Sequence, residues 1–123
     1  MNQKPTVLLV EDDLILVEAL QDKLSSSGFK VLIAKNGLEG LKKAMIEEVD
    51  LILLDLIMPR MDGMTMLRHL RQDEHIDTPV IVLTNLGSDE DAKGAMELGA
   101  KDFLIKADHG LDEVVDRIKK ILQ

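Results

Sequence analysis

The chain has 123 residues, 46% of them hydrophobic and 31% charged, with a formal net charge of −8 and no cysteine; these values fit one globular domain without disulfides rather than a disordered chain. The negative field disfavours nucleic acid and anionic membranes as partners, and no apolar run approaches the roughly 20 residues that span a bilayer. The polar first residues lack the apolar core of a signal peptide, so we expect a cytoplasmic protein.

The first part of the chain alternates short apolar runs with helical patterns. The run at residues 7–10 predicts a strand, and Asp13 is expected to begin the helix that Gly28 ends. The apolar stripe of this helix is Leu16, Leu20 and Leu24. Residues 31–34 and 51–54 predict two more strands. The helix between them has its stripe at Leu38, Leu41 and Met45.

The second part continues the alternation. Asp62 is a plausible N-cap for a helix that buries Leu67 and Leu70, and a strand follows at residues 80–83. The next helix ends at Gly99, and its stripe is Ala92, Ala95 and Met96. A last strand at 103–105 precedes the clearest helical stripe, which is Leu111, Val114, Val115, Ile118, Ile121 and Leu122.

This strict alternation predicts an α/β fold. Most of the apolar runs are unbroken, a pattern typical of parallel strands covered on both faces. At this length we expect a doubly wound, flavodoxin-like (βα)5 domain whose five-stranded parallel sheet has the order 2-1-3-4-5. The domain would occupy residues 1–123, with no output domain. Ligands of such sheets bind beyond the carboxyl ends of the strands, where the winding reverses between strands one and three.

Chemically active side chains follow four of the five predicted strands. Glu11 and Asp12 follow the first, Asp55 the third, Thr84 the fourth and Lys106 the fifth. Two like charges about 4 Å apart repel by roughly 1 kcal/mol in water and about 4 kcal/mol at an effective dielectric of 20, and one lysine cannot neutralise three acids. Carboxylate oxygens suit Mg²⁺, and these loops hold no histidine or cysteine for zinc.

Mg²⁺ beside a carboxylate permits one particular reaction. A carboxylate such as Asp55 can attack phosphorus and form an aspartyl phosphate, while the metal shields the negative charges that would repel the incoming group. The Thr84 hydroxyl and the Lys106 ammonium are groups of the right kind to contact the remaining phosphoryl oxygens.

These residues resemble the motifs of response-regulator receiver domains, notably the stand-alone, chemotaxis-regulator-like type. The distinctive stretch runs from Asp55 through Met58-Pro59 to Asp62-Gly63, and it is supported by Leu9-Val10-Glu11-Asp12, Leu83-Thr84 and Ile105-Lys106. The resemblance covers essentially the whole chain. It implies that Asp55 is the phosphoacceptor, that Thr84 and Lys106 contact the phosphoryl group, and that Thr84 and Phe103 act as a switch. The metal ligands it implies are Glu11, Asp12, Asp55 and the backbone carbonyl of Ile57.

Two residues depart from the family pattern. Asn85 follows the switch threonine, where a small residue is usual, and Ala107 follows Lys106, where proline is usual. A cis bond before a residue other than proline costs about 3 kcal/mol, so we expect a trans peptide at Lys106–Ala107. Both departures concern loop geometry and the lifetime of the phosphoryl group rather than the chemistry.

The resemblance implies a two-component response regulator. It would take a phosphoryl group from a histidine kinase or histidine phosphotransfer protein in a Mg²⁺-dependent reaction. It would catalyse only its own phosphorylation and dephosphorylation and would otherwise not be an enzyme. Its signal would pass to a protein target through the face formed by the helix around residues 92–96, the strand 103–105 and the last helix.

Other interpretations remain. One is an interaction module that keeps the fold without being phosphorylated, in which Phe103 is simply a core residue. A haloacid-dehalogenase-like phosphatase is disfavoured because Ile57 stands where that mechanism needs a second acid. A nucleotide binder is disfavoured because no glycine-rich loop follows the first strand.

Overall fold

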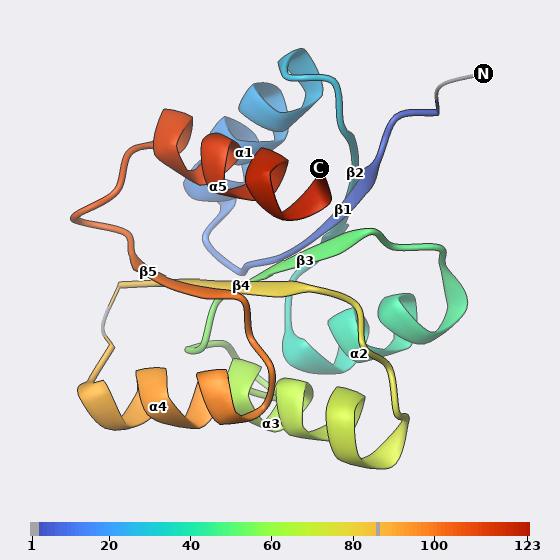
Figure 1. Cartoon of the computed structure of the whole chain (residues 1–123), viewed down its shortest axis with the longest axis vertical. Helices are drawn as coiled ribbons and strands as arrows, with labels where there is room; N and C mark the ends of the chain where they lie inside the picture. Colours follow the sequence, from blue (N-terminus) through green and yellow to red (C-terminus); the bar gives the residue numbers. More distant parts are fainter. Residues whose placement is uncertain (1–2, 86) are drawn as a thin grey trace.

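The computed structural model, which describes residues 3–85 and 87–123, contains a five-stranded parallel sheet of order β2-β1-β3-β4-β5 (Figure 1). The predicted fold and strand order are therefore confirmed. The strands are β1 (Thr6–Val10), β2 (Lys30–Ala34), β3 (Leu51–Leu54), β4 (Val80–Thr84) and β5 (Asp102–Ile105). The winding reverses between β1 and β3, where Val10 pairs with Leu54, so the residues that follow these two strands emerge side by side.

Helices cover both faces of the sheet, with α1 and α5 on one side and α2, α3 and α4 on the other (Figure 1). Their bounds are α1 (Leu14–Ser26), α2 (Gly37–Ile46), α3 (Gly63–Arg68), α4 (Asp89–Glu97) and α5 (Leu111–Leu122). A π-helical turn, η1 (His69–Asp73), continues α3, and the sequence pattern gave no sign of it. Within the two described ranges, no helix is both long and apolar enough to cross a membrane.

Short polar side chains fix where the helices begin. Asp13, Asn36, Asp62 and Ser88 each accept a hydrogen bond from a backbone N–H in the first turn of α1, α2, α3 and α4 respectively. Such a cap contributes about 1 kcal/mol because it satisfies a donor that the helix leaves unpaired. The predicted starts at Asp13 and Asp62 are thereby confirmed, and Gly28, with φ of 97°, takes the left-handed conformation just beyond α1.

The sheet separates two apolar clusters, and the inner strands are buried on both sides. In β3, Leu51 and Leu53 pack toward α1 and α5, while Ile52 and Leu54 pack toward α2, α3 and α4. Burying one such side chain contributes about 1.5–3 kcal/mol, so unbroken apolar strands are strongly held between the helix layers. The polar groups that follow them are thereby held at fixed positions at the sheet edge.

The prediction that Met45 and Met96 belong to the buried stripes of their helices is wrong. Met45 and Met96 each remain 49% exposed, so they lie at the border of the apolar stripe of their helices rather than within it. Helical spacing identifies the buried face only to within about one position on either side.

The loop after β3 is held by a close backbone approach at Gly63. The Gly63 N–H donates to the carbonyl of Leu56 at 2.9 Å, and a Cβ at Gly63 would overlap the backbone of Asp55 and Leu56. The start of α3 is therefore pressed against the residue that ends β3, which fixes the position of Asp55. No cis peptide bond occurs among the described residues, so the expected trans peptide at Lys106–Ala107 is confirmed.

Candidate functional site

The side chains predicted to share a site do meet in one pocket at the carboxyl edge of the sheet. The pocket has a volume of about 270 Å³. Its lining residues are Glu11, Asp12, Asp13, Asp55, Ile57, Thr84, Asn85 and Lys106. They lie at or just beyond the carboxyl ends of β1, β3, β4 and β5, which share one edge of the sheet, so the topology alone brings these groups together.

Asp55 and Glu11 are buried acids on neighbouring strand ends. The Asp55 N–H donates to the carbonyl of Val10 at 3.0 Å, and the Glu11 N–H donates to the carbonyl of Ala34 at 2.9 Å. The backbone of each acid is thereby fixed to a neighbouring strand. Asp55 is only 6% exposed and Glu11 only 2%, whereas Asp12 is exposed. Burying an acid disfavours its charged form unless a partner compensates it.

Lys106 supplies that partner. Its ammonium Nζ lies 2.7 Å from Glu11 Oε1 and 3.4 Å from Asp55 Oδ2. One cation therefore serves two buried carboxylates and lies nearer to Glu11. The Asp13 N–H also donates to Glu11, at 3.1 Å.

The pKa values of this group show the same imbalance. Burial raises the pKa of the Glu11 carboxyl, and the charge of Asp55 raises it further, although hydrogen bonds from Lys106 and the Asp13 N–H oppose the rise. Burial lowers the pKa of Lys106, but its hydrogen bond to Glu11 and the charge of Asp55 outweigh burial, so this pKa is raised overall. The charged form of Lys106 is thus favoured, whereas the charged form of Glu11 is disfavoured.

A divalent cation fits the three acids. Carboxylate oxygens of Glu11, Asp12 and Asp55 all lie within 4.8 Å of one another. Hard oxygen donors in this number suit Mg²⁺, which keeps several waters when one or two carboxylates hold it. The donor set contains no nitrogen or sulfur, so the chemistry of the site favours this class of ion.

The remaining predicted residues lie as follows. Thr84 is fully buried at the end of β4, and its carbonyl accepts from the Lys106 N–H at 2.8 Å. Asn85 lines the pocket and is exposed. Phe103 joins the apolar cluster on the α3 and α4 side of the sheet, and its ring lies where a Cβ on Gly87 would overlap it. The structure thus brings Phe103 near the loop after Thr84, on the side of the sheet away from α5.

Three features were not predicted from the sequence. The closer pairing of Lys106 with Glu11 is one, because the sequence predicted a single lysine among three acids without indicating which acid it would lie nearest. Gly87 is another, since only the fold shows that it accommodates the Phe103 ring. The third is a set of exposed apolar side chains beside the pocket: Leu14, Ile15 and Ile57, with exposed fractions of 63%, 82% and 60%. The available signal was the apolar pair Leu14-Ile15 directly after Asp13, and Ile57 two residues after Asp55.

Comparison with known proteins identifies relatives of the whole chain. Residues 7–119 match the response regulator receiver domain family. The chain is 39% identical over 123 residues to the alkaline phosphatase synthesis transcriptional regulatory protein PhoP of Bacillus subtilis, covering 100% of the chain and 50% of that protein. It is 43% identical over 118 residues to the transcriptional regulatory protein CpxR of Klebsiella pneumoniae, covering 95% and 49%. The chain thus spans about half the length of these relatives.

Solved structures agree with these matches. The Francisella response regulator 1452 receiver domain superposes with a TM-score of 0.90 at 31% identity, covering 97% of each chain. A chain from the CheX-CheY-BeF3-Mg+2 complex of Borrelia burgdorferi gives a TM-score of 0.89 at 28% identity, covering 98% of this chain and 91% of that one.

The shared lysine leads to a prediction about Glu11. In Asp55→Asn, the pKa of Glu11 should fall toward its ordinary value, because one repelling charge is gone and Lys106 serves Glu11 alone. Because the pKa of Glu11 is raised in the folded protein, the free energy of unfolding falls as pH rises through that pKa and Glu11 ionises. Asp55→Asn should therefore lose less stability than wild type over this pH range. Titration of the Glu11 carboxyl carbon by NMR measures the shift.

The control for this titration is Asp50→Asn, which removes an exposed acid just before β3, at the opposite end of the sheet. It should leave the Glu11 pKa unchanged. An equal fall in both variants would show that the net charge of the protein, and not the Asp55–Lys106 arrangement, sets this pKa.

Proposed function

The chain belongs to the response regulator receiver domain family of two-component systems, and we propose that it accepts a phosphoryl group on Asp55 from a histidine kinase or histidine phosphotransfer protein. One observation carries this proposal above all. Asp55 is buried at the end of β3 within reach of a lysine, beside two further acids. A structural role does not need a carboxylate there, because an amide would end the strand without the repulsion.

The proposed reaction exchanges one bond for another. An oxygen of Asp55 attacks phosphorus and forms an acyl-phosphate bond, while the bond between phosphorus and the donor's histidine nitrogen breaks and the nitrogen keeps its electron pair. Lys106 lies 3.4 Å from Asp55, so its ammonium can contact a phosphoryl oxygen. The Thr84 hydroxyl is the second group we assign to phosphoryl contact. The domain would catalyse only its own phosphorylation and dephosphorylation.

Glu11, Asp12 and Asp55, with the backbone carbonyl of Ile57, are the residues we propose as ligands of Mg²⁺. When bound, the ion would offset the negative charge of the acids and of the incoming group. Support comes from the cluster of carboxylate oxygens and from the similar chain in the CheX-CheY-BeF3-Mg+2 complex of Borrelia burgdorferi.

A protein donor must reach a carboxylate that is only 6% exposed. Leu14, Ile15 and Ile57 offer it an apolar surface beside the pocket, since all three are more than half exposed. We propose that the donor covers these side chains while it delivers the phosphoryl group. Burial of exposed apolar area is the general source of affinity in such contacts.

We propose that the signal leaves through a protein target on the face formed by α4, β5 and α5. Thr84 ends β4, and Phe103 lies against the loop that follows it. A phosphoryl group that draws the Thr84 hydroxyl inward would change the space available to the Phe103 ring. Such a two-state element links a local charge to a distant surface.

The wider setting also remains a proposal. The matched relatives are transcriptional regulators about twice as long as this chain, and one is named a DNA-binding regulator. That residues 1–123 themselves bind no nucleic acid and no membrane and work in the cytoplasm are predictions from charge and composition. A size determination of the protein purified from its cells would reveal an additional domain.

The acceptor assignment predicts a specific labelling result. Wild type incubated with acetyl phosphate and Mg²⁺ should gain the mass of one phosphoryl group, and Asp55→Asn should gain none. Asp62→Asn is the matched control, because Asp62 lies outside the pocket and asparagine can still cap α3. Intact-mass spectrometry separates the outcomes. Labelling of Asp55→Asn at the wild-type rate would refute the assignment, and no labelling of wild type by any donor would favour the non-phosphorylated module.

The metal assignment predicts a thermal shift. Mg²⁺ at 100 times its dissociation constant should stabilise the fold by about 2.7 kcal/mol, because it binds the assembled site and hardly the unfolded chain. Asp12→Asn should lose most of this shift and should be slightly more stable than wild type without metal, since one repelling charge is gone. The control is Asp13→Asn, which removes the same charge from the same pocket while asparagine still caps α1. Equal shifts in both variants would place the ion elsewhere.

The switch assignment predicts a difference between two conservative variants. Beryllofluoride should shift wild-type backbone amide NMR signals around Asp55, along α4 and around Phe103. Thr84→Ser keeps the hydroxyl and should keep the distant shifts. Thr84→Val keeps the shape without the hydroxyl and should lose the shifts of α4 and Phe103 while retaining those near Asp55. A full distant response in Thr84→Val would show that the coupling takes another route.

A further inference from the structure

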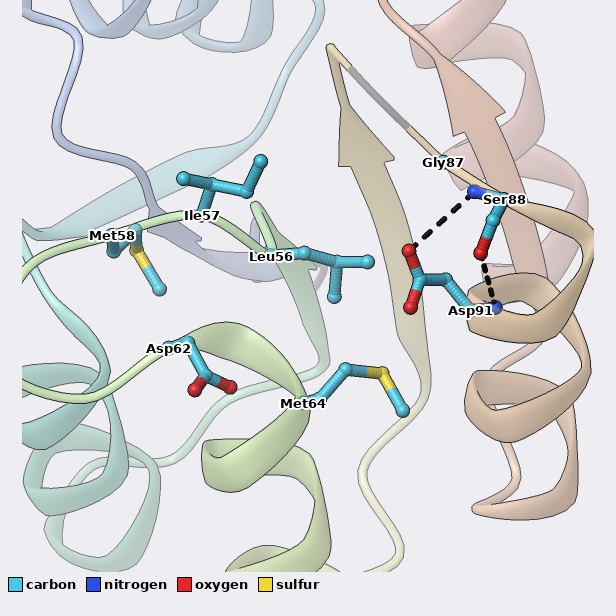
Figure 2. A pocket seen from close by; sticks show the side chains of 8 residues that line it. All are labelled: Leu56, Ile57, Met58, Asp62, Met64, Gly87, Ser88 and Asp91. Carbon is cyan, nitrogen blue, oxygen red and sulfur yellow. Dashed lines mark hydrogen bonds between the residues drawn. The ribbon is translucent and has the colours of Figure 1, made fainter.

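A second and larger hollow lies beside the acidic pocket, between the loop after β3 and the start of α4. Its volume is about 720 Å³. Figure 2 shows Leu56 and Met64 pointing across it toward the turn formed by Ser88 and Asp91. We call it the methionine groove and define it by its apolar and acidic lining residues: Leu56, Ile57, Met58, Met64, Asp62 and Asp91.

The apolar part of the groove combines a buried leucine with methionine side chains that can change conformation. Leu56 is buried at 6% exposure, whereas Ile57 is 60% exposed and Met58 and Met64 are half-buried. Met64 packs against α4, because a Cβ on Gly94 would come within 3.2 Å of the Met64 Cε. Methionine is flexible and polarisable, so it adapts to apolar partners of different shape. The groove therefore offers apolar contact to an incoming side chain without demanding one fixed shape.

The charge of the groove has one sign. Asp62 and Asp91 are its charged lining residues, and neither lysine nor arginine lines it. Both carboxylates are held in place, Asp62 by accepting from the Thr65 N–H at 2.8 Å and Asp91 by its capping box with Ser88. Asp89 and Glu90 add negative charge in the same turn of α4, within a protein of net charge −8. The field at the groove therefore favours a basic partner.

The position of the groove limits how a partner segment can bind. It lies over the ends of β3 and β4, which are inner strands paired on both sides, so a partner cannot add a strand there. Its lining contains no aromatic residue, which disfavours a polyproline segment, and its acids disfavour a phosphopeptide. An open groove with apolar and acidic lining fits the mode in which the apolar face of an amphipathic helix lies in a groove.

We propose that the methionine groove binds a basic amphipathic helix of a partner protein. The helix would place apolar side chains against Met58, Met64 and Ile57, and its lysines or arginines would face Asp62 and Asp91. The groove reaches the N-terminal turn of α4, a helix that also belongs to the α4–β5–α5 face, and binding of the helix does not require phosphorylation of Asp55.

The test uses a synthetic leucine–lysine peptide whose leucines recur at helical spacing, and a scrambled peptide of the same composition. Methyl-¹³C methionine spectra provide the readout, because the chain carries its own controls. The methyl signals of Met58 and Met64 should shift with the helical peptide and hardly with the scrambled one. Met45 and Met96 are 49% exposed but lie outside the groove, so their signals should stay in place. Equal shifts at all four methionines would overturn the proposal, as would the absence of binding.

Charge variants distinguish the groove from general attraction to an acidic protein. Asp62→Asn/Asp91→Asn removes two charges from the groove, and Glu47→Gln/Glu48→Gln removes two from exposed positions just after α2. The first double variant should weaken binding of the helical peptide by about tenfold, as expected from the loss of two close ion pairs. The second should weaken binding by less than about twofold. Thermal melts confirm that each variant is folded. Equal weakening by both doubles would show attraction by net charge alone and would refute the groove.

Discussion

The arrangement on which the site depends is a shortage of positive charge: one lysine faces two buried carboxylates. Lys106 lies 2.7 Å from Glu11 and 3.4 Å from Asp55, and Asp12 adds a third acid at the surface. Filling the site with polar but uncharged side chains would have removed the repulsion. The imbalance is tolerable because the apolar strands and helices around it supply far more stabilisation than the repulsion of about 1–4 kcal/mol removes. A site that is stable yet under-neutralised attracts cations and can respond strongly when one arrives.

The sheet topology creates this arrangement without any special local structure. Order β2-β1-β3-β4-β5 places β1 beside β3, so acids that are 44 residues apart in sequence, Glu11 and Asp55, follow adjacent strand ends. The lysine arrives from β5 at the sheet edge, beyond both β3 and β4. Only a long side chain crosses that distance, which gives a physical reason for lysine at this position. Gly63 completes the arrangement, because a side chain there would push α3 away from Asp55.

Much of this could be predicted from the sequence, and the reasons differ between the parts. The unbroken run Leu51–Leu54 predicted an inner strand, and the alternation of runs and helical stripes predicted the winding, because both depend on repeated patterns. The meeting of the pocket residues followed from strand order alone. The closer partnership of Lys106 with Glu11 did not follow, because strand order places backbones and does not say which of two acids a flexible side chain prefers. Gly87 was missed for a related reason: its contact with Phe103 joins a loop residue to a side chain of β5, and strand order does not show which loop a strand side chain meets.

The acidic pocket and the methionine groove share a wall. Ile57 lines both, and the groove extends from the loop after Asp55 to Gly87 and Ser88 in the loop after Thr84. Gly87, in the second of these loops, also lies against the Phe103 ring, so three features of the surface involve these short segments. A ligand can shift the state of another site only through a difference in its own affinity for the two states. Leu56 and Ile57 directly follow Asp55, so one or two peptide bonds join the residue that carries that carboxylate to the wall of the groove. The shortest covalent connection between the acidic pocket and the methionine groove therefore runs along the loop after β3.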